Sequence, residues 1–196
     1  MPDPLDRALA SAMRAVEIDP TFAEAHFIEA LVHFNRGEVD AFQVSAERAL
    51  ELSPNNASIL ADIGQQLGWL GEVERGVAMV RKAIAMNPNH PVWYHYFLSH
   101  YYRDKGDYET ALGHALRLTW DWHWDFVHRT AIYVDSGRMD EARAEAAKLI
   151  EVYPDFGEKA RVEFESWNIP DETIREYLAK LRAAGIDIPE DDMLTH

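Results

Sequence analysis

The chain has 196 residues, of which 47% are hydrophobic, and its 34 acidic and 19 basic side chains give a formal net charge of −15. The hydrophobic content is enough to build a core, whereas the negative charge disfavours nucleic acid and anionic membranes as partners. The sequence has no cysteine, no signal peptide and no long hydrophobic run, so we expect a cytoplasmic protein without disulfides, thiolate metal sites or membrane spans.

Proline and glycine divide the chain at a regular interval. Asp19-Pro20, Ser53-Pro54 and Asn87-Pro88 follow one another at 34-residue spacing, and each ends an apolar, alanine-rich stretch. Proline cannot continue a helix, so each pair predicts a helix end. Gly37 and Gly71 are also 34 residues apart and lie between two apolar-periodic stretches, where glycine suits a turn between helices. The repeating unit is therefore predicted to be helix, glycine turn, helix, proline turn.

A helix–turn–helix unit of this length is typical of the tetratricopeptide repeat (TPR), and the chain resembles that family over most of its length. Small residues, turn glycines and closing prolines match the family pattern at Ala30, Gly37, Ala46, Ala49 and Pro54, and again at Gly64, Gly71, Gly76, Ala83 and Pro88. The resemblance implies an all-α, right-handed solenoid of antiparallel helix pairs with about eleven helices. Phe42 stands where alanine is usual, and we expect its ring to fill a wider gap between two helices.

The predicted organisation treats residues 1–196 as a single solenoid. Residues 4–20 match only the second helix of a unit, and repeats are predicted at 21–54, 55–88, 89–122 and 123–156. Residues 157–186 are predicted to form C-terminal capping helices, and 187–196 a loose acidic tail. The orphan first helix suggests either a piece of a longer protein or an apolar face covered by a partner or a second copy, because repeat arrays need capped ends.

No catalytic or nucleotide-binding motif occurs in the sequence, so we expect neither enzyme activity nor a cofactor. Most histidines lie between residues 90 and 128, but His123 and His128 are five residues apart, which places the two rings on different faces of a helix. Asp121/Asp125 and Asp125/His128 do have the spacing of a shared face. Capping or surface pairing explains these pairs more simply than a metal ion, and we predict no metal site.

In tetratricopeptide proteins the first helix of each unit lines a concave groove, so the resemblance implies a partner-binding groove on those helices. The positions concerned are mostly aromatic, apolar or histidine: Phe27, Leu31, Phe34, Gln65, Trp69, Trp93, Tyr96, His100, Trp124 and His128. Family members that grip a C-terminal carboxylate use Lys, Arg and Asn at such positions, and those types are scarce here. An apolar or aromatic peptide, or a helix, is therefore the expected ligand.

Two aromatic runs qualify this expectation, because aromatic residues at helical spacing are often core residues. In the run 93–102 we expect Tyr94, Phe97, Leu98 and Tyr101 inside, and Trp93, Tyr96 and His100 partly exposed. The three tryptophans of the run 120–126 either wedge the third and fourth units together, which we favour, or form an exposed patch.

Two stretches carry a narrower resemblance. NPNHPVWYHYFLSHYYRDKGDYETAL (87–112) resembles the repeat region C-terminal to bacterial class III adenylate or guanylate cyclases and behind some winged-helix transcriptional activators, and WNIPDETIREYLAKLRAAGI (167–186) resembles the end of the cyclase-linked region. This implies a regulatory or dimerising part of a bacterial signalling protein, without the cyclase activity. We predict a scaffold that binds an unidentified protein or peptide. The alternatives are a self-associating, homodimeric domain and a metal protein or enzyme built on the histidine-rich middle.

Overall fold

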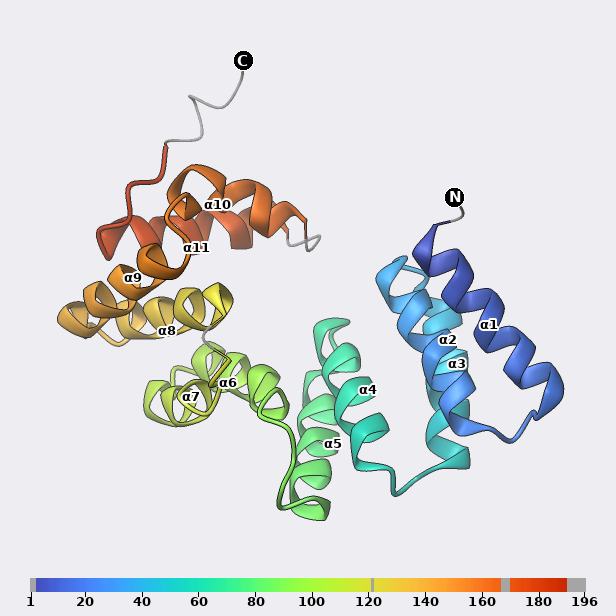
Figure 1. Cartoon of the computed structure of the whole chain (residues 1–196). Helices are drawn as coiled ribbons and strands as arrows, with labels where there is room; N and C mark the ends of the chain where they lie inside the picture. The colour runs from blue at the N-terminus through green and yellow to red at the C-terminus, as the bar shows by residue number, and fades with distance from the viewer. Residues whose placement is uncertain (1–2, 121, 167–169, 190–196) are drawn as a thin grey trace. The chain divides into compact units, whose positions relative to one another are not determined.

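The computed structural model of the chain describes residues 3–120, 122–166 and 170–189. Over these residues α-helix is the only regular secondary structure, as the sequence predicts (Figure 1). The helices are α1 (Pro4–Ile18), α2 (Ala23–Asn35), α3 (Val39–Leu52), α4 (Ala57–Trp69), α5 (Val73–Met86), α6 (Tyr94–Asp104), α7 (Tyr108–Ala115), α8 (His123–Asp135), α9 (Met139–Val152), α10 (Phe156–Glu165) and α11 (Asp171–Ala183). None of the helices in this described part has the length and apolar character needed to cross a bilayer.

The chain divides into two compact units, Met1–Phe97 and Leu98–His196, and the boundary falls inside α6. We refer to them as the N-terminal and the C-terminal unit. The prediction of one continuous solenoid over residues 1–196 stays a prediction.

The turns lie where the sequence places them. Gly37 separates α2 from α3 and Gly71 separates α4 from α5, with φ values of 71° and 102°. This left-handed region favours glycine because the residue has no Cβ. Pro20, Pro54 and Pro88 each follow the end of a helix, at α1, α3 and α5. The predicted helix–turn–helix unit is therefore confirmed at these positions.

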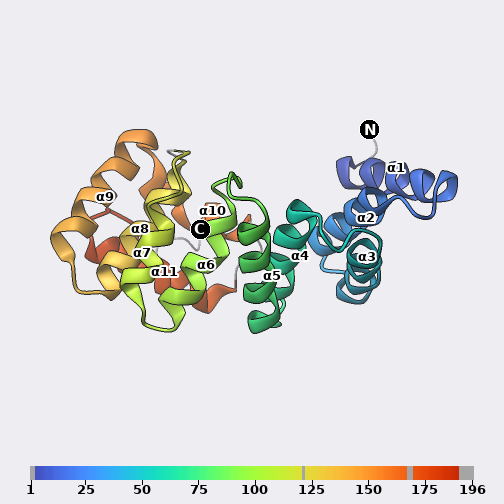
Figure 2. The ribbon, with the colours of Figure 1, turned by 90° about the horizontal axis from the view of Figure 1, so that it is seen from below.

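In the N-terminal unit α2 packs beside both α1 and α3, and α4 forms a hairpin with α5 (Figures 1 and 2). The first core of this unit is made by α2, α3 and α4, from Ala23, Ala30, Phe42, Ala46, Ala49, Ile59, Ile63 and Leu67. The Phe42 ring is fully buried and lies 5.7 Å from the Phe34 ring, centroid to centroid. Phe42 thus fills space inside the first hairpin as expected, while the predicted widening of the gap stays a prediction.

The second hairpin, α4 and α5, has glycine where its two helices meet. A Cβ on Gly76 would lie 2.3 Å from the carbonyl oxygen of Gly64, and a Cβ on Gly64 would lie 2.9 Å from the Cβ of Met79. No real Cβ contact is that short, so α4 and α5 approach each other through their backbones. The expectation that small residues permit a close helix approach is confirmed for this pair.

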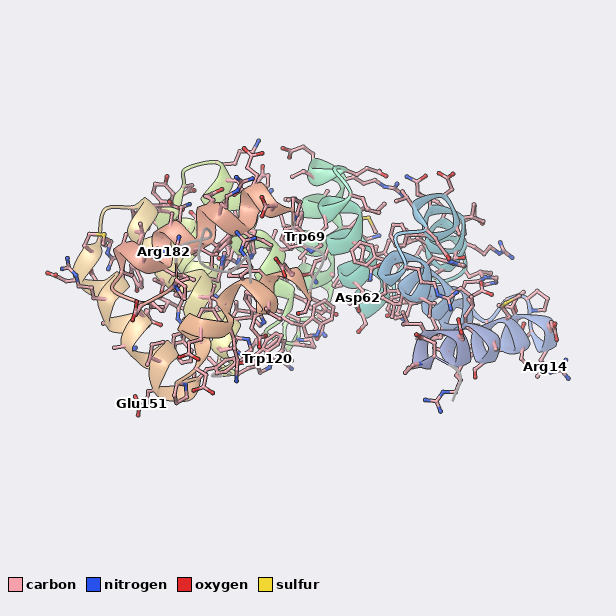
Figure 3. The ribbon with its side chains drawn as sticks, turned by 90° about the horizontal axis from the view of Figure 1, so that it is seen from above. Arg14, Asp62, Trp69, Trp120, Glu151 and Arg182 are labelled. Atoms are coloured by element: carbon pink, nitrogen blue, oxygen red, sulfur yellow. The ribbon has the colours of Figure 1, made fainter. Side chains whose placement is uncertain are left out.

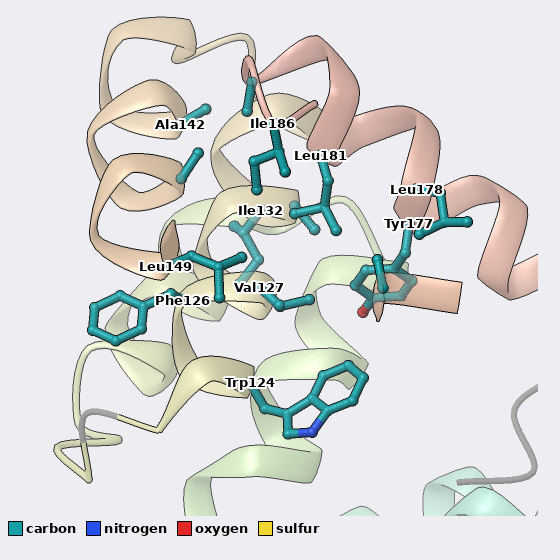
Figure 4. Packing of buried hydrophobic residues seen from close by; sticks show 14 of the residues in the cluster. Trp124, Phe126, Val127, Ile132, Ala142, Leu149, Tyr177, Leu178, Leu181 and Ile186 are labelled. Carbon is teal, nitrogen blue, oxygen red and sulfur yellow. The ribbon is translucent and has the colours of Figure 1, made fainter. Parts of the chain in front are cut away.

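In the C-terminal unit α6 and α7 are joined by a hydrogen bond from the Ser99 hydroxyl to the Ala111 carbonyl, at 2.8 Å. α8 pairs with α9, and α11 packs on both α8 and α10. The core lies among α7, α8, α9, α10 and α11 (Figure 4). Trp124 on α8 packs edge-on against Phe164 on α10, with ring centroids 4.8 Å apart.

The two aromatic runs differ in how well they match expectation. Tyr94, Phe97 and Leu98 are buried as predicted and Trp93, Tyr96 and His100 are half-buried as predicted, but Tyr101 is only half-buried. In the second run Trp124 is buried, whereas Trp120 and Trp122 are exposed. The favoured wedge of three tryptophans is therefore wrong for two of them, because Trp120 and Trp122 precede α8 and only Trp124 is part of that helix.

Candidate functional site

Two of the predicted groove residues are withheld from any partner. Trp124 is 6% exposed and His128 is 2% exposed. Both lie on α8, against which α11 and α10 pack. Figure 4 shows Trp124 among the side chains of this core, with Tyr177 on α11 nearby. The prediction that Trp124 and His128 line a binding surface is corrected: in the C-terminal unit they belong to its interior.

His100 joins the same interior on its other side. Its ring stacks on the His128 ring with centroids 3.9 Å apart, and the Tyr177 hydroxyl lies 3.4 Å from its Nδ1. Tyr177 also accepts a hydrogen bond from Nη1 of Arg103 at 2.7 Å. A hydroxyl that accepts from a guanidinium can still donate its own proton, and Nδ1 of His100 would accept that proton in the tautomer that carries its hydrogen on Nε2.

Arg103 is the centre of this buried polar network. Besides Tyr177 it contacts Asp135 and Glu176, each at 2.7 Å, and it is 8% exposed. Lys180 on α11 pairs with Asp135 as well, at 2.7 Å. The network therefore ties α6, α8 and α11 together with charge-assisted hydrogen bonds, which are about twice as strong as neutral ones. Its partners come from within the unit, which makes the cluster a structural element of the C-terminal unit.

The two stacked histidines are held neutral. Burial, followed by the nearby Arg103 charge, lowers the pKa of His100 to about 3, and burial lowers the pKa of His128 well below its usual value. Ser99 uses its proton on the Ala111 carbonyl, so Nε2 of His128, 2.8 Å from the Ser99 oxygen, must be the donor in that pair. His128 is thus the Nε2–H tautomer.

We expect acid to destabilise the C-terminal unit. The unfolded chain protonates these histidines near pH 6.5, whereas the folded unit does not, so stability is fully present above that pH and falls as the pH drops below it. Each histidine removes up to about 1.4 kcal/mol per pH unit, or about 2–4 kcal/mol for the pair between pH 7.5 and 5. Hydrogen exchange of α6 and α8 across this range measures the loss. The His100→Phe variant should show a weaker dependence of stability on pH. Exchange rates of α6 and α8 that show no loss of stability in acid would contradict the conclusion that both histidines are neutral in the folded unit.

The N-terminal unit presents a different surface. Corresponding positions of α2 and α4, 34 residues apart, form two stripes at helical spacing: Glu24, Ile28, Leu31 and Asn35, and Ser58, Asp62, Gln65 and Trp69. None of these eight side chains is fully buried. The helices α2 and α4 also contact each other. We call this surface the α2–α4 face.

Three of the predicted groove residues, Leu31, Gln65 and Trp69, lie on the α2–α4 face. Trp69 is 46% exposed, and its ring is held from one side by Phe97 at 5.0 Å and Tyr96 at 6.4 Å, centroid to centroid. Phe27 and Phe34 sit beside the α2 stripe, half-buried against the core. All of these residues and Tyr96 belong to the N-terminal unit. Trp93 belongs to it as well and is half-buried, with its ring against Tyr94.

No protein-family model matches the chain, and no curated protein matches it. Solved structures do. YrrB, described as a TPR protein with an unusual peptide-binding site, is 21% identical with a TM-score of 0.65, covering 95% of this chain and 96% of that one. TTC0263, a thermophilic TPR protein of Thermus thermophilus, is 20% identical with a TM-score of 0.65 and 91% of each chain covered. The type IV pilus biogenesis factor PilW is 20% identical with a TM-score of 0.66, covering 92% of this chain and 81% of that one.

The chain has a tetratricopeptide-type fold. The fold prediction is therefore confirmed by the helical structure and by these likenesses together. At such identities the likeness concerns the fold and identifies no residue that recognises a partner.

A shallow depression of about 730 Å³ lies elsewhere on the tetratricopeptide-type N-terminal unit. Its lining comes from α2, α3 and the start of α5, and includes His26, Glu29, Glu47, Arg48, Glu51, Glu72 and Arg75. The charges there are paired with one another: Arg75 contacts Glu47 and Glu72, Arg48 contacts Glu51, and His26 contacts Glu29. A surface whose charges already have partners offers little for recognition of a ligand.

Sequence periodicity missed Asp62, the one charged residue of the α4 stripe. It lies four residues after Ser58 and three before Gln65, so the spacing that selected Gln65 and Trp69 would have included it. Figure 3 labels Asp62 and Trp69, both on α4. For metal chemistry, the residues that the structure describes contain no group of three or more His, Asp or Glu side chains suited to holding an ion; Asp121 lies outside those residues.

Proposed function

We propose that this protein is a non-enzymatic scaffold that binds a peptide or helix of a partner protein on the α2–α4 face of its N-terminal unit. One observation carries the proposal: Trp69 keeps nearly half of its surface open to solvent while Tyr96 and Phe97 fix its ring. A rigid, exposed aromatic side chain is the usual energetic centre of a protein interface, because it buries much area and loses little freedom on binding.

The C-terminal unit supports the choice of a helix or helical peptide as ligand. There the chain's own α11 packs on α8 and reaches α6 through Tyr177, burying Ile174, Tyr177, Leu178 and Leu181. The helices α6 and α8 are the first helices of predicted units, as α2 and α4 are. In the C-terminal unit these helices thus bind an amphipathic helix of the same chain. We propose that in the N-terminal unit the corresponding helices bind one from a partner.

Further observations support the kind of ligand, the compartment and the role that we propose. YrrB is described as having a peptide-binding site, which supports peptide binding as the activity of the fold. We propose the cytoplasm as the compartment, because the chain lacks cysteine. The resemblance of residues 87–112 and 167–186 to cyclase-linked repeat regions supports a regulatory role in a bacterial signalling protein, and that role is part of the proposal.

We expect Trp69→Ala to weaken binding by about 1–4 kcal/mol, because the substitution removes the central anchor of the face. Peptides selected from a displayed library against the intact chain provide the ligand, and titration calorimetry measures the affinity. Trp120→Ala is the matched control, since Trp120 is 52% exposed but belongs to the C-terminal unit. An equal loss of affinity in both variants would indicate nonspecific binding to exposed tryptophans. An unchanged affinity in Trp69→Ala would place the site elsewhere.

Self-association is the second candidate, and α1 is the feature that favours it. Met13 is 52% exposed, Ile18 is 73% exposed, and Phe22, just after the helix, is also exposed. Three large apolar side chains on one short segment are typical of a surface that another chain covers. Light scattering over a range of concentrations separates the two candidates, because a constant monomer mass rules out the homodimer.

A further inference from the structure

The α2–α4 face contains an acidic side chain that nothing in the fold neutralises. Asp62 is half-buried on α4, and no hydrogen bond or ion pair reaches its carboxylate from any residue that the structure describes. One turn further along the helix, Gln66 is 8% exposed and its carbonyl oxygen has no hydrogen-bond donor. Asp62 is therefore an unpaired acceptor on the accessible side of α4, whereas the Gln66 oxygen lies in the interior, out of contact with solvent.

This arrangement is unfavourable for the fold. Burial raises the pKa of Asp62 to about 6, with desolvation as the cause. A carboxylate that loses water without gaining a counter-charge destabilises the folded state, as does a buried amide oxygen without a donor. Neither group therefore contributes to the stability of the N-terminal unit through a bond of its own. Groups kept at a cost to stability are concentrated at functional sites.

The charge of the whole face points in one direction. The two stripes carry Glu24 and Asp62 and no lysine or arginine. Glu24 accepts only a long hydrogen bond, from the side-chain amide of Asn56 at 3.5 Å, among the described residues. Ser58 and Gln65, on either side of Asp62 in its own stripe, are polar but uncharged, and Ile28, Leu31 and Trp69 are the apolar members of the two stripes. A ligand that is complementary to this face is apolar around a single positive charge.

We propose that the partner segment carries a lysine or arginine side chain that binds Asp62 on α4, between apolar residues that contact Leu31 and Trp69. This inference rests on the proposed function and specifies its ligand. Lysine and arginine side chains carry hydrogen-bond donors and a positive charge and no acceptor, so either of them complements an unpaired carboxylate. A charge-assisted bond inside an apolar surround is stronger than one in open solvent.

The test uses short peptides selected on the intact chain as before, each resynthesised with Lys, Gln or Glu at its central polar position. Wild type, Asp62→Asn and the control Asp40→Asn are compared by calorimetry at neutral pH; Asp40 is exposed on α3 and outside the face. We expect wild type and Asp40→Asn to bind the Lys peptide at least about tenfold more tightly than the Gln peptide, which is about 1.4 kcal/mol. In Asp62→Asn this preference should disappear while Gln-peptide affinity is kept.

The outcomes separate the two levels of the proposal. Peptides that bind and lose affinity in Trp69→Ala, yet show no preference for Lys or keep it in Asp62→Asn, overturn the cation site and leave the protein-binding function standing. If no peptide binds the α2–α4 face at all, both are overturned. Asp62→Asn should also raise the urea midpoint, since it removes a desolvated charge; a lowered midpoint would show that Asp62 serves the fold and would contradict the inference.

Discussion

Arg103→Ala is expected to lower the free energy of unfolding of the C-terminal unit by about 3 kcal/mol. The guanidinium holds Asp135, Glu176 and Tyr177 at 2.7 Å each, so each of the three loses a hydrogen bond on its removal. Glu176 is half exposed and keeps Lys180 as a partner, so the loss falls mainly on Asp135 and Tyr177. Breaking a buried ion pair from one side costs about 3–5 kcal/mol because the remaining charge stays desolvated. Lys180 still reaches Asp135, which places the expected loss at the lower end of that range.

Urea denaturation together with hydrogen exchange of α6, α8 and α11 measures this effect. Arg14→Ala is the control, because Arg14 forms an exposed pair with Glu17 within α1, and such a pair contributes about 0.5 kcal/mol or less. Exchange should increase in α11 first, since that helix is joined to α6 through Arg103. A variant as stable as wild type would mean that the network is solvated and that apolar packing alone fixes α11.

Gly76→Ala is expected to destabilise the N-terminal unit by about 2–3 kcal/mol, although alanine is normally the better helix former. The new Cβ would lie 2.3 Å from the Gly64 carbonyl oxygen and 3.0 Å from the Gly68 nitrogen. Both neighbours are backbone atoms, so α4 and α5 can accept the methyl group only by moving apart. That movement weakens the contact along the whole hairpin, including the part of α4 that carries Asp62 and Trp69.

The control for this variant is Gly113→Ala. Gly113 is exposed on α7, and an added Cβ there meets nothing within 4 Å. The same substitution should therefore stabilise the chain by about 0.5–1 kcal/mol. Thermal or urea unfolding of the two variants should show opposite signs. A stabilised Gly76→Ala variant would show that the hairpin can open without loss.

The helices and turns of this chain could be predicted because local chemistry determines them. Proline after α1, α3 and α5, and glycine at positive φ between paired helices, act on the backbone within a few residues. Their 34-residue spacing then identifies the type of unit. Burial of the Phe42 ring could be predicted for the same reason. Positions 42 and 76 are equivalent in the 34-residue repeat, and the sequence shows that the first helix pair has phenylalanine where the second has glycine.

The candidate site was predicted less well, because it depends on contacts between distant segments. Trp124 and His128 occupy repeat positions like those of the α2–α4 face, and no sequence pattern states that α11 packs on α8 and covers them. Burial of Trp124 but not of Trp120 or Trp122 has the same origin. Asp62 was missed for another reason: its significance comes from having no partner, and only the structure can show that.

The position of α11 also has a consequence for how the chain would respond to proteolysis. Ile174, Tyr177, Leu178 and Leu181 are the buried residues of α11, which packs on α8 and α10. Cleavage that released the residues after 170 would therefore uncover apolar side chains of α8. The product would expose a hydrophobic surface and would be prone to aggregation. In the intact chain α11 covers these side chains of α8, so an intact C-terminal segment keeps that apolar surface away from solvent.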